Sequence, residues 1–261
     1  MNFKNKYFLG ISCFYHNSSA ALVEDNKIIA AAEEERFSRI KHDKSFPIKS
    51  ILFCLEYANI SIDQINSIVF YDNSFKTLER FQITNSRLKI IDYYKASKKI
   101  INNRFFIREN FKKFFNIHPK TKIYFLDHHL SHASSAFYPS AFSDSAILTI
   151  DAVGEWATTT IAHGSNNKIK ILKSINFPNS VGLLYSAFTS YCGFKVNSGE
   201  YKLMGLAPYG KPNYYDILKN KILKIFEDGS IKLNLKYFNF RFEQKIFTDH
   251  LTKELGFPPR L

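Results

Sequence analysis

Three of the eight histidines in this chain fall within one short stretch, Asp127-His128-His129-Leu130-Ser131-His132. His128 and His132 are four residues apart, so on a helix both imidazoles project from the same face. Neutral imidazoles are common ligands of divalent transition metals. A bound metal needs a further protein ligand, and Asp151, at the end of the next predicted strand, is the natural candidate. The alternative is a pair of hydrogen-bonded histidines at the start of a helix.

Two other stretches combine small and polar residues. The stretch from Asp151 to Trp156 places the only tryptophan beside Gly154 and Glu155, where it could equally be a packing anchor. The stretch from Phe194 to Gly210 holds three of the ten glycines. Glycine lets a backbone approach a ligand closely, and amides near a helix start attract phosphate. Neither a P-loop nor a G-x-G-x-x-G pattern is present, so these stretches suggest a phosphate site without identifying one.

Charge is concentrated in one segment. Residues 76–122 hold 13 Lys or Arg against three acids and thus supply +10 of the net charge of +13. Aromatic residues are interleaved with these cations, a combination that can bind nucleic acid. Apolar residues such as Ile90, Ile91 and Tyr94 recur near helical spacing, however, and this favours amphipathic helices that pack on the core. We therefore do not expect nucleic acid as a partner. The mixed charges of residues 33–43 are typical of a solvated edge.

The composition is that of a globular protein, with 45% hydrophobic residues and 16% aromatic residues. Three cysteines without C-x-x-C spacing argue against a disulfide scaffold and against zinc ribbons. No apolar run approaches the roughly 20 residues that span a bilayer. We expect a cytoplasmic protein with no membrane partner.

Strands and helices are expected to alternate along the chain. Strands are predicted at residues 8–12, 19–23, 28–32, 65–71, 122–126, 146–150, 158–162 and 169–172. Helices are predicted at residues 47–58, 128–137, 180–191 and 213–226, and within the basic segment. Ser180 is the predicted N-cap of its helix, and Gly193 follows the end of that helix.

A weak internal repeat links the first three predicted strands with the last three. Ser19 lies seven positions after Ser12, and Thr158 lies seven positions after Asp151. Each copy reads as a three-stranded meander with a polar loop after its first strand. Two such meanders followed by helices predict a duplicated α/β architecture with a cleft between its halves, like the actin-like and sugar-kinase-like folds that hold a nucleotide.

The order of six motifs resembles the N-terminal half of the O-carbamoyltransferases of antibiotic and nodulation-factor biosynthesis. The motifs are Gly10-Ile11-Ser12 with Phe14-Tyr15-His16, Glu34 to Asp43, His128 to Ala133, Ile150 to Thr159, Tyr185 to Thr189, and Gly193 to Gly210. The resemblance implies an actin-like (ASKHA), duplicated ribonuclease-H-type α/β fold, related to the tRNA threonylcarbamoyl-transfer protein. Residues 1–261 would be the N-terminal actin-like domain, with a first lobe at about 1–140 and the start of an incomplete second lobe at about 141–261.

The same resemblance implies metal-assisted transfer of a carbamoyl group from carbamoyl adenylate to a hydroxyl of a small-molecule or sugar acceptor. Carbamoyl adenylate would come from ATP and carbamoyl phosphate, made by an adenylate-forming domain that these residues lack. We therefore expect the missing C-terminal half, or a partner chain, to be needed for turnover. The implied metal is iron, held by His128, His132 and Asp151. The residues implied to bind the adenylate are Gly154, Glu155, Asn197, Glu200 and Lys202. The residues implied to be catalytic are His16, Arg39 and Lys41, with His16 as general base.

Two other functions remain open from the sequence. One is threonylcarbamoyl transfer to tRNA, in which the basic segment would bind RNA. The other is a non-catalytic fragment that binds nucleotide or a partner.

Overall fold

The computed structural model describes residues 6–85, 90–240 and 245–260. Internal contacts divide the chain into two units, residues 1–131 and 132–261. This division falls inside helix α6 (His128–Phe137). The lobe boundary at about residue 140 stays a prediction. Within the described ranges, no helix is both long enough and apolar enough to cross a membrane.

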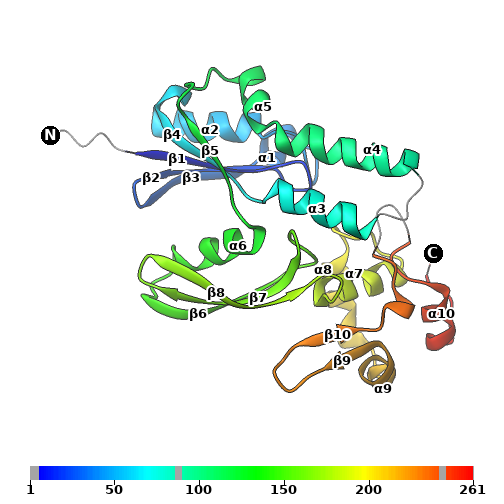
Figure 1. Cartoon of the computed structure of the whole chain (residues 1–261). Coiled ribbons are helices and arrows are strands. Elements are labelled where there is room, and N and C mark those ends of the chain that lie inside the picture. The colour runs from blue at the N-terminus through cyan, green and yellow to red at the C-terminus, as the bar shows by residue number, and fades with distance from the viewer. Residues whose placement is uncertain (1–5, 86–89, 241–244, 261) are drawn as a thin grey trace. The chain divides into compact units, whose positions relative to one another are not determined.

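The first unit is built on a five-stranded sheet in the order β3-β2-β1-β4-β5 (Figure 1). Its strands are β1 (Tyr7–Ser12), β2 (Ser19–Glu24), β3 (Lys27–Glu33), β4 (Ile65–Phe70) and β5 (Lys122–Phe125). The first three strands form the predicted antiparallel meander, and β4 and β5 continue the sheet in parallel with β1. The carboxyl ends of β1, β4 and β5 therefore lie at the same edge of the sheet. In α/β proteins, ligands usually bind at the carboxyl ends of parallel strands.

Helix α2 (Ile48–Ala58) packs against strands β2 and β3 and completes the hydrophobic core of the first unit. Ile51 and Cys54 are completely buried, and the thiol of Cys54 donates to the carbonyls of Ala20 and Ala30 on β2 and β3. Burial of each large apolar side chain contributes about 1.5–3 kcal/mol. The short helices α1 (Glu35–Ser38) and η1 (Ile62–Gln64) flank these elements.

Most of the described part of the basic segment is helical, as its periodicity predicted. It forms α3 (Ser74–Thr84), α4 (Ile90–Ile100), the π-helix η2 (Ile101–Phe105) and α5 (Ile107–Phe114). Ile107 and Phe111 of α5 are buried in the core of the first unit. The apolar side of α4 is packed only in part, because Ile90, Ile91 and Tyr94 are largely exposed. The expected packing on the core therefore holds for α5 more than for α4.

The second unit begins with the other predicted meander, an antiparallel sheet in the order β6-β7-β8. Its strands are β6 (Asp144–Ile150), β7 (Ala157–Ser165) and β8 (Lys168–Asn176). Ala133 and Phe137 of α6 pack on Ile147 and Ala162 of this sheet. A Cβ at Gly164 would lie 2.7 Å from the Phe137 ring, so glycine is needed for this close packing.

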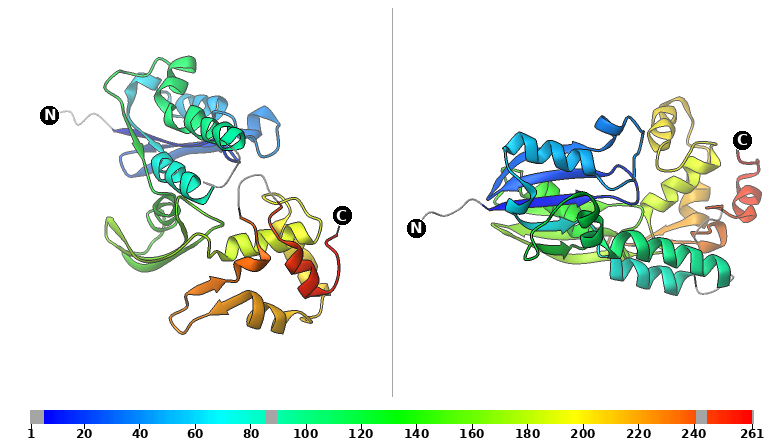
Figure 2. Two further views of the ribbon diagram at one scale, coloured as in Figure 1. Left: turned by 45° about the vertical axis from the view of Figure 1, so that its right-hand side comes forward. Right: turned by 90° about the horizontal axis from the view of Figure 1, so that it is seen from above.

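Two helices were predicted in the remainder of the second unit. The helix at 180–191 is present, and the helix at 213–226 is shorter than predicted. The elements are α7 (Val181–Tyr191), α8 (Glu200–Leu206), η3 (Ala207–Tyr209), α9 (Tyr215–Ile217), η4 (Leu218–Ile222), β9 (Leu223–Ile225), β10 (Ile231–Leu233), η5 (Leu235–Tyr237) and α10 (Asp249–Leu255). The helix predicted at 213–226 is wrong beyond residue 222, because β9 pairs with β10 in a hairpin (Figure 2). The turn contains Asp228-Gly229, with Gly229 at φ +79°. This pair is a strong hairpin signal that the helical interpretation overlooked.

A second core holds these elements together. Tyr191 of α7, Ile222 of η4 and Leu251 of α10 are buried at its centre. No helix was predicted after residue 226, whereas α10 supplies two buried leucines to this core.

Candidate functional site

Helix α6, which carries the two candidate histidine ligands, is anchored at its first turn. The carboxylate of Asp127, just before the helix, accepts from Nζ of Lys76 at 2.7 Å and from Nδ2 of Asn73 at 3.3 Å. The hydroxyl of Ser131 donates to the carbonyl of Tyr71, at the end of β4. These hydrogen bonds of Asp127 attach the start of α6 to the amino end of α3.

The predicted metal-ligating residues come together as expected. One ligand atom each from His128, His132 and Asp151 lie within 4.8 Å of one another. The histidines are one turn apart on α6, and Asp151 directly follows β6. Nε2 of His132 lies 3.6 Å from Oδ2 of Asp151. The His132 side chain is half exposed and that of Asp151 is one-third exposed, so a small ion can reach both.

The backbone around Asp151 is held at several points. The amide of Ala152 donates to Oδ1 of Asp151 at 2.6 Å, which orients the carboxylate. The amide of Asp151 donates to the carbonyl of Thr158 on β7. The buried hydroxyl of Ser180 donates to the carbonyls of Asp151 and Ala152, at 3.1 and 2.7 Å. Ser180 is also the N-cap of α7, accepting from the amide of Leu183, so one side chain ties the helix start to the ligand-bearing loop.

The three residues fit a divalent transition-metal ion by their chemistry. Two imidazoles and one carboxylate form a donor set that first-row transition metals favour. At metal–ligand distances of about 2.0–2.2 Å, two ligands of one ion lie at most roughly 4.4 Å apart. The ligand atoms of this cluster all lie within 4.8 Å of one another, a limit close to that separation.

Comparison with known proteins supplies the family. A model of the family described as "Carbamoyltransferase N-terminus" matches residues 7–256 of the chain. This chain belongs to the carbamoyltransferase family. The resemblance noted in the sequence is thereby confirmed, and with it the assignment of the chain to a family of enzymes.

Two relatives of this carbamoyltransferase-family chain are longer than it is. It is 46% identical to the uncharacterized protein sll1178 of Synechocystis over 90% of its length, which is 40% of that relative. It is 37% identical to the nodulation protein NolNO of Sinorhizobium fredii over 85% of its length, which is 32% of that protein. The chain thus spans less than half of either relative.

Among solved structures, component A of the (R)-2-hydroxyglutaryl-CoA dehydratase of Acidaminococcus fermentans resembles the chain. The TM-score is 0.37 at 12% identity, over 80% of this chain and 70% of that one. The mixed α/β class is confirmed by the structure of the chain itself. A likeness at this score does not establish the actin-like fold, which stays a prediction.

The residues implied to be catalytic lie in the first unit on two adjacent segments. His16 is exposed on the loop between β1 and β2, while Arg39 and Lys41 are exposed after α1. Backbone hydrogen bonds join the two segments, from Phe14 to the carbonyl of Lys44 at 2.9 Å and from Ser18 to that of Asp43 at 2.7 Å. The fold therefore brings the two predicted segments alongside each other.

One acidic residue of the same charged run has a structural role that the sequence did not reveal. Glu34 is 4% exposed, although the run was interpreted as a solvated edge. Its carboxylate accepts from the amides of Lys49 and Ser50, at 3.0 and 2.8 Å, and from the Ser50 hydroxyl. These groups belong to the first turn of α2, so Glu34 caps that helix and complements its dipole.

The residues implied to bind the adenylate in the second unit lie on two loops joined to α7. Gly154 and Glu155 follow β6, where Glu155 is buried. Asn197 and Glu200 lie at the start of α8, where Oε1 of Glu200 accepts from the Asn197 amide at 2.9 Å and from the Ser186 hydroxyl at 3.1 Å. Burial raises the pKa of Glu200, but these hydrogen bonds outweigh it, and the net shift is downward. Helix α7 thus contacts both loops, through Ser180 and through Ser186.

Lys202 borders a hollow in the second unit. The hollow measures about 620 Å³, within the usual range for a small-molecule site. Arg260 supplies a second cation, and Phe194 and Leu206 supply apolar lining. Lys202 is exposed on α8 and accessible to an anionic ligand.

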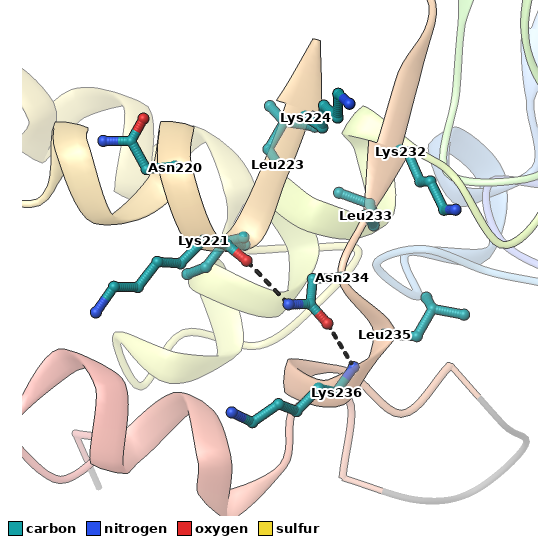
Figure 3. Close-up of a pocket in the computed structure, with 10 residues that line it drawn as sticks. Asn220, Lys221, Leu223, Lys224, Lys232, Leu233, Asn234, Leu235 and Lys236 are labelled. Atoms are coloured by element: carbon teal, nitrogen blue, oxygen red, sulfur yellow. Dashed lines mark hydrogen bonds between the residues drawn. The ribbon is translucent and has the colours of Figure 1, made fainter.

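A second hollow lies under the β9–β10 hairpin and contains none of the predicted residues. It measures about 520 Å³ and is lined by four lysines, Lys221, Lys224, Lys232 and Lys236. Figure 3 shows that their ammonium groups point in different directions and do not converge. The side-chain amide of Asn234, at the centre of the hollow, donates a hydrogen bond to the carbonyl of Lys221 and accepts one from the amide of Lys236. This arrangement does not form a focused anion site.

Proposed function

We propose that the chain takes part in transfer of a carbamoyl group from carbamoyl adenylate to a hydroxyl of a small-molecule or sugar acceptor. The observation that carries the proposal is the convergence of His128, His132 and Asp151 in a chain of the carbamoyltransferase family. In the reaction, the bond between the carbamoyl carbon and the phosphate oxygen breaks and AMP leaves. A bond forms from the acceptor oxygen to the carbamoyl carbon, and the hydroxyl proton passes to a base.

His128, His132 and Asp151 would hold a divalent metal, with iron as the ion that the family resemblance implies. When bound, this ion would supply Lewis acidity near the carbamoyl or phosphate oxygen. Asp151 would contribute the negative charge of the ligand set, and its carboxylate is already oriented by the Ala152 amide.

The remaining roles fall to side chains of the chain itself. His16 would accept the proton of the acceptor hydroxyl, because its imidazole is exposed and histidine is the side chain that most often serves as a general base. Lys202 would offset the negative charge of the leaving phosphate from the edge of its hollow. Arg39 and Lys41 are two more exposed cations that could serve the same purpose.

A stable mimic of the intermediate tests this proposal without knowledge of the acceptor. 5′-O-(N-carbamoylsulfamoyl)adenosine keeps the carbamoyl group and replaces the phosphate by a non-reactive, negatively charged acyl sulfamate, and calorimetric titration measures its binding. We expect saturable binding, weakened roughly tenfold in Lys202→Ala, since one charge-assisted contact is lost. Lys211→Ala, which removes another exposed lysine, is the control and should bind like the parent. Absence of binding by the parent chain would contradict the proposal.

A further inference from the structure

On one side of the loop that carries His16, a ring contact, a cation–π contact and an ion pair follow one another. The His16 ring lies 4.7 Å from the ring of Tyr15, and the guanidinium of Arg104 lies 5.9 Å above Tyr15. Arg104 is in turn paired with the carboxylate of Asp72, and both side chains are mostly buried. The neighbour of His16, Tyr15, therefore contacts a mostly buried ion pair, although the rings of Tyr15 and His16 are themselves exposed.

On the other side, a single amide oxygen contacts two imidazoles. Oδ1 of Asn17 lies 3.0 Å from Nδ1 of His16 and 3.2 Å from Nδ1 of His42. Asn17 and His42 both have left-handed backbone conformations, at φ +48° and +56°. The backbone bond from Ser18 to the carbonyl of Asp43, next to these residues, holds the two segments in register.

The burial of His42 decides which way the Asn17 amide faces. Nε2 of His42 is buried and has no hydrogen-bond partner among the residues that the structure describes. If the amide nitrogen of Asn17 faced the two rings, both Nδ1 atoms would be acceptors and Nε2 of His42 would be a buried N–H without an acceptor. Buried N–H groups of this kind are rarer than unfilled acceptors. The oxygen therefore faces the rings, as the structure has it.

An oxygen can only accept a hydrogen bond, so each Nδ1 that contacts it carries the hydrogen. We propose that Asn17 is a positioning residue that fixes His16 in the Nδ1–H tautomer and so leaves Nε2 as the unprotonated nitrogen. The hydrogen bond at one ring nitrogen sets the protonation of the other. This proposal rests on the proposed function, in which Nε2 of His16 is the atom that takes the proton of the acceptor hydroxyl.

Long-range ¹H–¹⁵N correlation spectra of the imidazoles read the tautomer directly, in the whole chain and without substrate. Free neutral histidine favours the Nε2–H form, so the Nδ1–H form at His16 is diagnostic. His163 is an internal reference for the opposite form, because its Nε2 lies 2.9 Å from a carboxylate oxygen of Asp144, which can only accept.

Three variants separate the role of the acceptor from that of the backbone. Asn17→Asp keeps an acceptor oxygen and should keep the Nδ1–H form of His16. Asn17→Gly tolerates the positive φ but removes the acceptor, so His16 should revert to the Nε2–H form. Asn59→Gly changes the same residue type at a similar φ, +53°, away from these histidines, and should change neither signal.

The Nε2–H form at His16 in the parent chain, or an unchanged Nδ1–H form in Asn17→Gly, would overturn the proposal. If Asn17→Gly does not fold, the parent and Asn17→Asp spectra still decide it. A negative result here leaves mimic binding unaffected, and failure of mimic binding leaves the tautomer unaffected, so the two proposals fail separately.

Discussion

Gly182 lies directly against the backbone of Asp151. A Cβ at Gly182 would come within 2.6 Å of the carbonyl oxygen of Asp151, a distance that real Cβ atoms essentially never show. The obstacle is backbone, which cannot rotate aside as a side chain could. The first turn of α7 therefore approaches the end of β6 closely only because residue 182 has no side chain, and this approach helps to set the position of the candidate metal ligand.

We expect Gly182→Ala to weaken metal binding as well as stability. The added methyl group must displace the Asp151 backbone, which moves its carboxylate relative to His132 and costs about 1–3 kcal/mol as overpacking. Urea unfolding and metal titration measure the two effects. Gly205→Ala is the matched control, because a Cβ there meets nothing within 4 Å, and it should leave both quantities close to those of the parent. Parent-like metal affinity in Gly182→Ala would contradict the assigned role of this contact.

Removal of the Glu34 carboxylate should destabilise the first unit. Its three hydrogen bonds satisfy the amides of Lys49 and Ser50 and the Ser50 hydroxyl in a buried position. Glu34→Ala leaves these donors unpaired, and we expect a loss of about 1–3 kcal/mol in the free energy of unfolding in urea. Glu33→Ala, one residue earlier and less buried, should change it by no more than about 0.5 kcal/mol. Equal effects of the two substitutions would show that Glu34 has no capping role.

Features that depend on residues near one another in sequence were predictable. Helix α7 was predicted with its N-cap Ser180, because a capping side chain bonds to an amide three residues away. The pair His128 and His132 was predicted to share a helix face for the same reason, since helical spacing alone brings them together. Asp151 was predicted from its position at a strand end, and the register of β6 with β7 places it there.

Features that depend on contacts between distant segments were not predictable. Glu34 looked like one of several exposed charges, and only the packing of α2 against the sheet shows why it is buried. The shared contact of His16 and His42 with Asn17 spans 25 residues. The sequence gives only a weak indication of the close contact at Gly182. Glycine early in a helix lowers helix stability, so its presence there indicates that another element packs closely against it.

Glu200 predicts a pH dependence of stability with a definite sign. Its hydrogen bonds hold the pKa of the folded carboxyl below the ordinary value of 4.5, so the folded chain favours the ionised form. Its contribution is complete above the ordinary pKa and is lost as the pH falls through the lowered folded value. In urea unfolding, Glu200→Gln should be less stable than the parent at pH 7, and the difference should shrink on acidification toward pH 3. A difference that grows on acidification would contradict this assignment.

The metal content of the purified chain tests the account most directly. After loading with Fe²⁺ under anaerobic conditions and removal of free metal, elemental analysis should find about one ion per chain. His128→Ala/His132→Ala should lose that ion. The control His118→Ala/His163→Ala, which removes two exposed histidines elsewhere, should retain it. Equal metal content in the ligand variant and the parent would contradict the assignment of His128, His132 and Asp151 as a metal site.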